Sequence, residues 1–486
     1  PYSPHVGHGG GIYLADLVVP SLVSGNVVRD NFGGHNYDGS GGGVYVSGSE
    51  VTITDNHITG NAASWSGSRG EGGGILIHGG KVLVHSNVIT GNFGGGFPGF
   101  PSTAIGLGGG VASLDGNTIL RGNLIEGNGA TNGVNWGMGG GIYGAGGTID
   151  VVDNQIAHNW GCVDGEGCFG GGVALTGTLG LVEDNLVLDN RATDAAFGAG
   201  GGIYGGIGTY HVVGNVISGN LASATNYGWG GGLYFQWDEP WLDANTILNN
   251  QATPGSNGYG GGVRLASCAP FTLTNNIIAG NDASATGSGI AVAVDSAGVL
   301  VHNTLAENMP GDGAGLAVQQ RSHVTLTNNI VASQTLGILN ADLVNSTVYA
   351  RYTLFDGNGT DHSGGVTSVD EVAGPAGLLP NYHLDNGSNA IANALPLAWI
   401  THDVDGDARP YRGAPDVGAD EVSCLAHVVG GGGVYFTIQE AVGVATSGQT
   451  VRVATGTCYE NVAITESLTL EGGWDLAFNT RVAQPA

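Results

Sequence analysis

Polar and aliphatic residues recur along most of the chain with a regular spacing. Pairs of asparagines with four residues between them occur ten times, and the step between pairs is 30 or 31 residues in most repeats. A valine, isoleucine or leucine stands two residues after each leading asparagine, from Val28 to Leu305. The pairs are Asn26/Asn31, Asn56/Asn61, Asn87/Asn92, Asn123/Asn128, Asn154/Asn159, Asn185/Asn190, Asn215/Asn220, Asn245/Asn250, Asn276/Asn281 and Asn303/Asn308.

A second motif, three glycines followed by an aliphatic residue, lies between the asparagine pairs. The runs begin at Gly9, Gly41, Gly72, Gly108, Gly139, Gly170, Gly200, Gly230 and Gly260. Short β-branched runs such as residues 51–54 separate the two motifs. Such runs, bounded by glycine and asparagine, predict strands of about three to six residues with tight corners. The repeats contain no stripe of helical period.

Strands this short do not form a free sheet, but they are stable when each repeat stacks on the next in register. The sequence therefore predicts an all-β fold, a parallel β-helix of about eleven or more coils spaced ~4.8 Å apart. Identical asparagines at one corner are expected to hydrogen-bond along the stack as a ladder. We assign these asparagines a structural role.

Composition restricts the function. The 486 residues include 94 glycines, and 12 Lys+Arg stand against 40 Asp+Glu for a net charge of −28. Nucleic acid and anionic membranes are therefore unlikely partners, because both are bound through clustered basic residues. The 41% hydrophobic content argues against a disordered chain. No apolar run of membrane-spanning length and no signal peptide is present, so we expect a mature chain or a fragment.

The five cysteines favour disulfides over a metal site, since none forms a C-x-x-C motif. Cys162 and Cys168 flank a short acidic loop, and Cys424 and Cys458 bracket one segment. We predict these two disulfides and one leftover thiol, Cys268, whose role is open. Disulfides suit an oxidising, extracellular setting.

The repeats, over about residues 9–340, resemble bacterial right-handed parallel β-helix proteins of the pectate-lyase-like superfamily. The glycine-aliphatic and asparagine motifs are similar to the GGA(I/L/V) and FxxN repeats of chlamydial polymorphic outer-membrane proteins, although the Phe is absent here. The resemblance implies the fold. It does not decide function, since this fold carries lyases, hydrolases, tailspikes and adhesins.

Residues 378–421 resemble the end module of the choice-of-anchor Q family in the order and spacing of their motifs. The motifs are residues 378–384, 387–388, 403–410 and 415–421. The usual Pro-Ala-Ile-Asp is replaced by Asn389, Ala390, Ile391 and Ala392. The resemblance implies a large secreted or surface protein of bacteria.

Residues 424–486 read as the beginning of a second β-helix. Thr437 and Glu440 form a capping box that opens a short helix over residues 438–444, and residues 450–453 and 468–474 read as strands. We therefore divide the chain into β-helix repeats (1–340), terminal coils and end module (341–423), and a cap with first strands (424–486). Two explanations stay open: tandem β-helices in a longer chain, or a tail that joins the next subunit head to tail.

No catalytic set is assigned. The resemblance implies, for lyases, an Arg or Lys base beside carboxylates that hold calcium, but the basic residues of the repeats are scattered singly. Arg264 stands where other repeats have tyrosine, and we expect it to point outward into solvent. Asp153 and Asp184 precede the asparagines of consecutive coils, about one coil apart. A turn-forming role is the better interpretation for these two. Without a convincing catalytic constellation the sequence leans away from an enzyme but leaves the question open.

Asp403, Asp405 and Asp407 offer oxygen ligands at alternating positions of one loop, with Asp416 and Asp420 nearby. Hard oxygen ligands of this kind suit Ca²⁺. The loop lacks the final glutamate of an EF-hand, so a solvated acidic turn is the alternative. Calcium is the one cofactor that the sequence suggests.

Aromatic residues collect in the loops between the second asparagine and the next triple glycine. In a solenoid such loops stack on one flank, which is the usual binding face. The candidate binding residues are Trp65, Phe97, Trp136, Trp160, Trp229 and Tyr259. They would stack on sugar rings or on a neighbouring rod; the alternative is packing of the loops against each other.

The sequence thus favours a structural or adhesive component of a bacterial cell-surface fibre. Its expected partner is itself, through head-to-tail or tandem β-helices, with polysaccharide as a second partner. The alternatives are a carbohydrate-binding β-helix module and a polysaccharide lyase or hydrolase. The expected location is extracellular, without direct insertion into a membrane.

Overall fold

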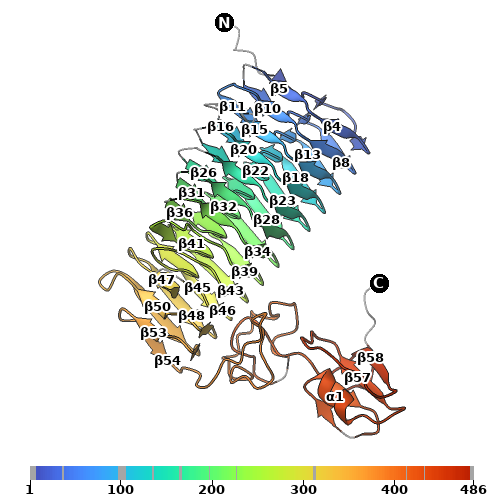
Figure 1. The fold of residues 1–486 in the computed structure, drawn as a ribbon, viewed down its shortest axis with the longest axis vertical. Coiled ribbons are helices and arrows are strands. Elements are labelled where there is room, and N and C mark those ends of the chain that lie inside the picture. Colours follow the sequence, from blue (N-terminus) through green and yellow to red (C-terminus); the bar gives the residue numbers. More distant parts are fainter. Residues whose placement is uncertain are drawn as a thin grey trace.

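The computed structural model describes residues 7–35, 38–96, 105–133, 136–163, 167–195, 197–225, 227–309, 313–411, 413–431 and 433–481. Over these residues the chain is nearly all β, with one α-helix. Residues up to 369 wind into a long solenoid of five parallel sheets that run along its axis (Figure 1). The predicted all-β parallel β-helix is confirmed.

One coil shows how the repeat forms its strands. Its five strands are β12 (Ile75–His78), β13 (Lys81–His85), β14 (Val88–Thr90), β15 (Phe93–Gly95) and β16 (Ile105–Leu107). Each pairs in parallel with its counterpart one coil before and one coil after, as β12 does with β7 (Val44–Ser47) and β17 (Val111–Leu114). We name the five sheets after these five strands.

The β12 and β13 sheets have 13 strands each, which agrees with the predicted eleven or more coils. The β14 sheet has 12 strands, and the β16 and β15 sheets have nine and seven. The sheets run from β2 (Ile12–Ala15) to β53 (Thr360–Ser363), β3 (Ser21–Ser24) to β54 (Thr367–Val369), β4 (Val27–Arg29) to β52 (Leu354–Asp356), β1 (Gly7–His8) to β40 (Asn257–Tyr259), and β5 (Phe32–Gly34) to β35 (Leu221–Ser223).

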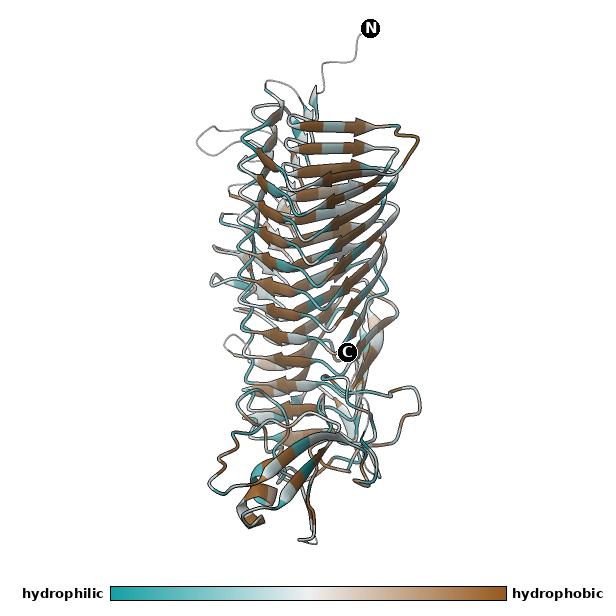
Figure 2. Cartoon of the chain, turned by 90° about the vertical axis from the view of Figure 1, so that its right-hand side faces the viewer, coloured by the Kyte–Doolittle hydropathy of each residue, from teal (hydrophilic) through white to brown (hydrophobic). Residues whose placement is uncertain are grey.

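The core runs along the inside of the solenoid. The aliphatic residue after each triple glycine and the one after each leading asparagine both point inward, and Ile75, Ile89, Ile142 and Ile156 are fully buried. Hydrophobic residues recur in the strands of every coil in Figure 2. Each such side chain contributes ~1.5–3 kcal/mol when it is removed from water.

The asparagines form the predicted ladders. The backbone N–H and the side-chain Nδ2 of Asn154 both donate to Oδ1 of Asn185 one coil on, at 2.9 and 3.0 Å. The same Nδ2 donates to the carbonyl of Leu120 one coil back, at 2.9 Å. The second asparagine of each pair forms a parallel ladder, which ends through Gln334 and Asn358. A buried amide that bonds in both directions has all its polar atoms satisfied, so these residues are structural.

The triple glycines are required by the close approach of three backbones. Gly139 has a left-handed φ of 65°. A Cβ on Gly140 would lie 2.3 Å from the carbonyl oxygen of Trp160 and 2.4 Å from that of Gly171. At this corner the β16 sheet folds back on the β15 sheet, and no side chain fits between them.

Residues 376–421 form an irregular module that lies on the side of the solenoid. Its Ala376, Ala390 and Val417 pack on Ile330 and Leu354, on the outer face of the β14 sheet. In Figure 1 the module lies beside the last coils, and no strand of the described chain pairs with the outer edges of β53 and β54. We call this segment the side module.

The C-terminal unit follows as a separate small sheet with a helix. Its elements are β55 (Ala426–Val428), β56 (Val434–Tyr435), α1 (Ile438–Val444), β57 (Thr450–Ala454) and β58 (Thr469–Trp474). β57 and β58 pair in parallel, and the other pairs are antiparallel. Thr437 caps α1 by accepting the N–H of Glu440 at 2.9 Å. The predicted helix and both predicted strands are therefore present.

Among the described residues, α1 is too short to cross a bilayer, and no longer apolar helix occurs.

Candidate functional site

A row of aromatic side chains runs along one flank of the solenoid. Phe169, Trp229 and Tyr259 occupy matching positions of β26 (Gly167–Phe169), β36 (Tyr227–Trp229) and β40 in the β16 sheet. Trp136 stacks on Phe169 with ring centres 5.6 Å apart, and Phe197 stands edge-on to Trp229 at 4.6 Å. We call these five residues the aromatic row.

The row is partly open to solvent. Trp136 is 50% exposed, and Tyr227 beside Phe197 in the next strand is 49% exposed. The other members are half-buried against tyrosines of the β12 sheet, among them Tyr204 and Tyr234. Predicted binding residues Trp136, Trp229 and Tyr259 are thus brought together in one surface.

Arg264 corrects one expectation. It does point away from the solenoid core, but it is only 6% exposed rather than solvated. Its guanidinium carbon lies 4.7 Å from the Trp229 ring and 5.0 Å from the Tyr259 ring. The reason is that strands of the β16 sheet cover the outer face of the β12 sheet at this coil. Burial lowers the pKa of Arg264, although the nearby tyrosines oppose the shift.

The other predicted binding residues lie elsewhere. Trp65 follows β10 (Ala62–Ser64) and stacks on His35 with ring centres 5.6 Å apart. Trp160 begins β25 (Trp160–Cys162) and covers Gly129 of the preceding coil. Trp160 belongs to the β15 sheet and Trp65 directly follows one of its strands; the glycine and alanine face of this sheet is packed on the β16 sheet. They therefore lie in the other layer, and Phe97 lies outside the described residues.

Asp153 and Asp184 are corner residues, as expected. Both are exposed and adopt left-handed φ values of 55° and 54° directly before a ladder asparagine. Partial burial raises the pKa of Asp184, and the charge of Asp153 adds to the shift. Asp55, Ser86 and other residues hold the same conformation at this corner. The pair therefore serves the turn.

Buried charged side chains hold the side module together through hydrogen bonds to its backbone. The carboxylate of Asp416 accepts the N–H groups of Ala392 and Val422, at 2.7 and 2.8 Å. Arg409 donates to the carbonyls of Asp416 and Ala419 at 2.6 and 2.9 Å, and lies 3.4 Å from Glu421. Burial raises the pKa of Glu421 to about 7. This network explains the spacing of charged residues in the module.

The module is joined to the solenoid through two histidines. Nε2 of His402 lies 2.8 Å from Oδ2 of Asp243, at the end of β38 (Trp241–Asp243). Nδ1 of His302, a buried corner residue, lies 2.7 Å from Nη1 of Arg409. Neither histidine was singled out from the sequence, because their partners are 159 and 107 residues away.

The predicted calcium residues do come together. Ligand oxygens of Asp403, Asp405 and Asp407 lie within 4.8 Å of one another. However, Asp403 accepts N–H groups from Asp405, Asp407 and Glu421 at 2.8–2.9 Å, as a turn-forming carboxylate does. Asp407 accepts the N–H of Thr457 at 2.8 Å. Calcium binding here stays a prediction.

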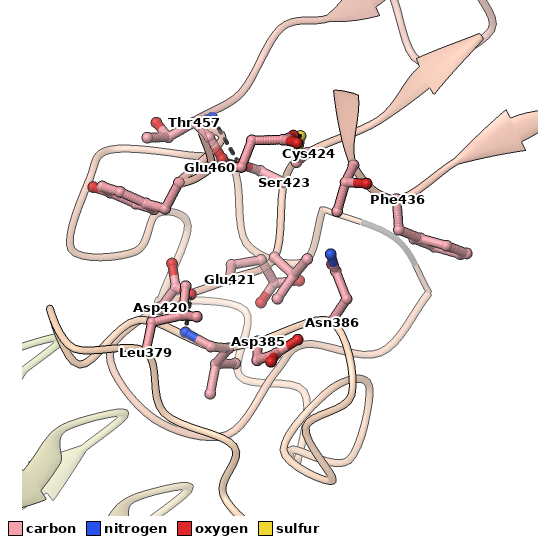
Figure 3. Close-up of a pocket in the computed structure, with 14 residues that line it drawn as sticks. Leu379, Asp385, Asn386, Asp420, Glu421, Ser423, Cys424, Phe436, Thr457 and Glu460 are labelled. Carbon is pink, nitrogen blue, oxygen red and sulfur yellow. Dashed lines mark hydrogen bonds between the residues drawn. The ribbon is translucent and has the colours of Figure 1, made fainter. Parts of the chain in front are cut away.

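A cavity of about 160 Å³ lies where the side module meets the C-terminal unit. Figure 3 shows Asp385, Asp420 and Glu421 of the module on one side and Phe436 and Glu460 of the unit on the other. Glu460 accepts N–H groups at the start of α1. A second cavity of about 520 Å³ adjoins it and shares some of its lining.

Both predicted disulfides are present. Cys162 is bonded to Cys168 with Cα atoms 5.8 Å apart, and Cys424 to Cys458 with Cα atoms 4.9 Å apart. Cys268 is buried, with its thiol 3.4 Å from the carbonyl of Phe235. Burial raises the pKa of this thiol to about 12, so it is an inert core residue.

Comparison with known proteins defines the class of the solenoid. The Beta_helix family, described as a right handed beta helix region, matches residues 230–371, so this part is a right-handed parallel β-helix. The crystal structure of pectate lyase Pel9A is 13% identical over 78% of this chain and 88% of that chain, with a TM-score of 0.35. None of the curated proteins compared with the chain matches it. Likeness at this level transfers no function.

Proposed function

We propose that this chain is a structural and adhesive rod of the bacterial cell surface, which binds polysaccharide along the aromatic row. The observation that carries the proposal is the continuity of the row, whose rings touch from Trp136 to Trp229 over successive coils. Sugar rings present apolar faces that stack on aromatic side chains. A rigid rod repeats such contacts at a fixed spacing.

The spacing of the rings along the row suits a glycan chain. Trp136 and Phe197 are aligned two coils apart in the register of the β16 sheet, with Gly167 between them. Two coils span about 10 Å, which is close to the length of an extended disaccharide. A polysaccharide laid along the rod would therefore meet an aromatic ring at regular intervals.

Charge favours a neutral glycan over an acidic one. The chain carries 40 Asp+Glu against 12 Lys+Arg. An anionic polysaccharide would be repelled by this surface unless salt or a cation screened it. The two disulfides support a location outside the cell.

The test is binding of the full chain to an array of neutral and acidic polysaccharides. We expect Trp136→Ala to weaken binding to neutral glycans at least tenfold, because one stacking contact is lost. Trp241→Ala is the matched control, since this tryptophan is also exposed but lies on the β13 sheet. Absence of binding by the unmodified chain would overturn the proposal.

The same samples test the alternatives. Release of reducing ends or unsaturated uronates from any polysaccharide would identify a hydrolase or lyase instead. Electron microscopy of the purified chain tests the structural part of the proposal. Fibres with a regular axial repeat would support head-to-tail joining of copies, and single rods would assign the adhesive role to one chain.

A further inference from the structure

Three side chains that can bind a metal converge at the junction of the side module and the C-terminal unit. They are His383, Asp405 and Asp420, and their ligand atoms lie within 4.8 Å of one another. They come from three separate segments of the module. The cluster adjoins the 160 Å³ cavity, because Asp420 also lines that cavity.

The imidazole of His383 is oriented as a metal ligand. Its Nδ1 lies 3.1 Å from the carbonyl oxygen of Asn381, and because a carbonyl only accepts, Nδ1 carries the proton. Nε2 faces Asp405: in the protonated ring it pairs with that carboxylate, and in the neutral ring its lone pair can bind a metal ion in exchange for the proton. It is buried, lies 3.1 Å from Oδ2 of Asp405, and makes no well-aligned hydrogen bond. The side chain is only 9% exposed and Nε2 itself is buried, so solvent water does not hydrogen-bond to this nitrogen.

Each carboxylate is held in place by a further partner. Oδ2 of Asp420 accepts the N–H of Leu384 at 2.7 Å. Oδ1 of Asp405 accepts the hydroxyl of Tyr459 at 2.6 Å, and the ring of Tyr459 packs 4.0 Å from the His383 ring. Outer hydrogen bonds that fix the orientation of every ligand are a regular feature of metal sites in proteins.

The local charge is unbalanced toward anions. Asp403 lies beside Asp405 and Asp420, and its own oxygens bind the backbone. The Arg409 guanidinium donates hydrogen bonds to the carbonyls of residues 416, 418 and 419, and its charge acts on Asp403. A divalent cation between Asp405 and Asp420 would offset the repulsion of carboxylates in this partly buried site.

We propose that His383, Asp405 and Asp420 bind one divalent transition-metal ion of the zinc class. One imidazole and two carboxylates are ligands that Zn²⁺ accepts, whereas Ca²⁺ prefers oxygen ligands alone. Three protein ligands leave a position open toward the cavity. Through Tyr459 the ion would also fasten the C-terminal unit to the side module. The proposal is independent of polysaccharide binding.

The test uses the full chain after treatment with a chelator. Titration with Zn²⁺ is expected to show one equivalent bound, with a rise in thermal midpoint. Co²⁺ is expected to give visible absorption bands of a site with a nitrogen ligand. His383→Ala should lose the bands and weaken binding at least 100-fold. His362→Ala is the matched control, because this histidine lies on β53, away from the junction.

A second variant guards against misfolding. Asp420→Asn keeps an oxygen that can accept the N–H of Leu384 but removes the charge, and it should weaken Zn²⁺ binding at least tenfold. No binding by the unmodified chain, or binding unchanged in both variants, overturns the proposal. Binding of Ca²⁺ without competition from Zn²⁺ also overturns it, and assigns the cation to the loop of Asp403 and Asp407.

Discussion

The guanidinium carbon of Arg264 lies 4.7 Å from the ring of Trp229, a residue of the β16 sheet that covers Arg264 and leaves it only 6% exposed. No carboxylate of the described chain pairs with this cation, and its Nε and Nη1 have no hydrogen-bond partner there. Tyr234, and the aromatic faces of Trp229 and Tyr259, thus compensate its charge. The relationship shows that the outer face of the β12 sheet is a second core.

The first prediction follows from this burial. A buried charge without a counter-ion is costly, and replacing it with an apolar side chain of similar length is often neutral or stabilising. We expect Arg264→Met to change the free energy of unfolding by less than about 1 kcal/mol or to raise it. Arg264→Ala should lower it by ~1–3 kcal/mol, because it leaves a cavity between the two rings. Denaturant unfolding of both variants checks this.

The second prediction concerns the ladders. Asn154→Ala removes the acceptor of two Asn123 donors and the donor of the Leu120 carbonyl, all in the buried interior. Each unsatisfied group costs ~1–3 kcal/mol. We expect a loss of ~2–4 kcal/mol in unfolding free energy, and Asn26→Ala, at an exposed rung, should lose much less. Equal losses in the two variants would contradict the ladder argument.

The third prediction concerns Asp238, a buried carboxylate at the corner between the β12 and β13 sheets. Its Oδ1 accepts the N–H of Gly208, whereas Oδ2 has no partner among the described residues. Burial raises the pKa of Asp238 to about 7. The folded chain thus binds a proton more tightly than the unfolded chain, so stability falls as pH rises from about 4 to about 7.

Asp238→Asn should remove this dependence and raise stability at pH 8 by ~1–3 kcal/mol. The measurement is the thermal midpoint from pH 4 to pH 8. Asp115→Asn, at an exposed corner, controls for removal of one charge. A variant with the same pH profile as the unmodified chain would show that Asp238 is not the titrating group.

The fourth prediction concerns His302, whose effect on the pH dependence of stability is opposite to that of Asp238. Burial, and then the charge of Arg409, hold the pKa of His302 well below 6.5. The unfolded chain takes up a proton near pH 6.5 and the folded chain does not, so stability falls as pH drops below that value. His302→Asn should remove the loss, because Asn275 and Asn328 hold the same left-handed corner. Thermal unfolding at pH 5 and pH 7 separates the two outcomes.

Much of the solenoid was predictable because its determinants are local. A left-handed corner favours glycine, aspartate or asparagine, and a ladder needs an amide at one position of every coil. The ladder role of Asn154 and the corner role of Gly139 could therefore be predicted from their spacing in the sequence alone. The helix at residues 438–444 was equally predictable, because Thr437 caps its N-terminus and Glu440 stands in its first turn. Cys162 and Cys168 were paired correctly for the same reason of proximity.

The sequence by itself determined the coil period, the inward aliphatic residues, the ladders and the disulfides, because each depends on residues close along the chain or on an exact repeat. Only the tertiary structure decided that Arg264 is covered, that Trp65 and Trp160 lie in a different layer from Trp229, and that His383 meets Asp405 and Asp420. Those relationships depend on how sheets and an irregular module pack on one another. No periodic pattern records that packing, since it brings together segments that share no repeat.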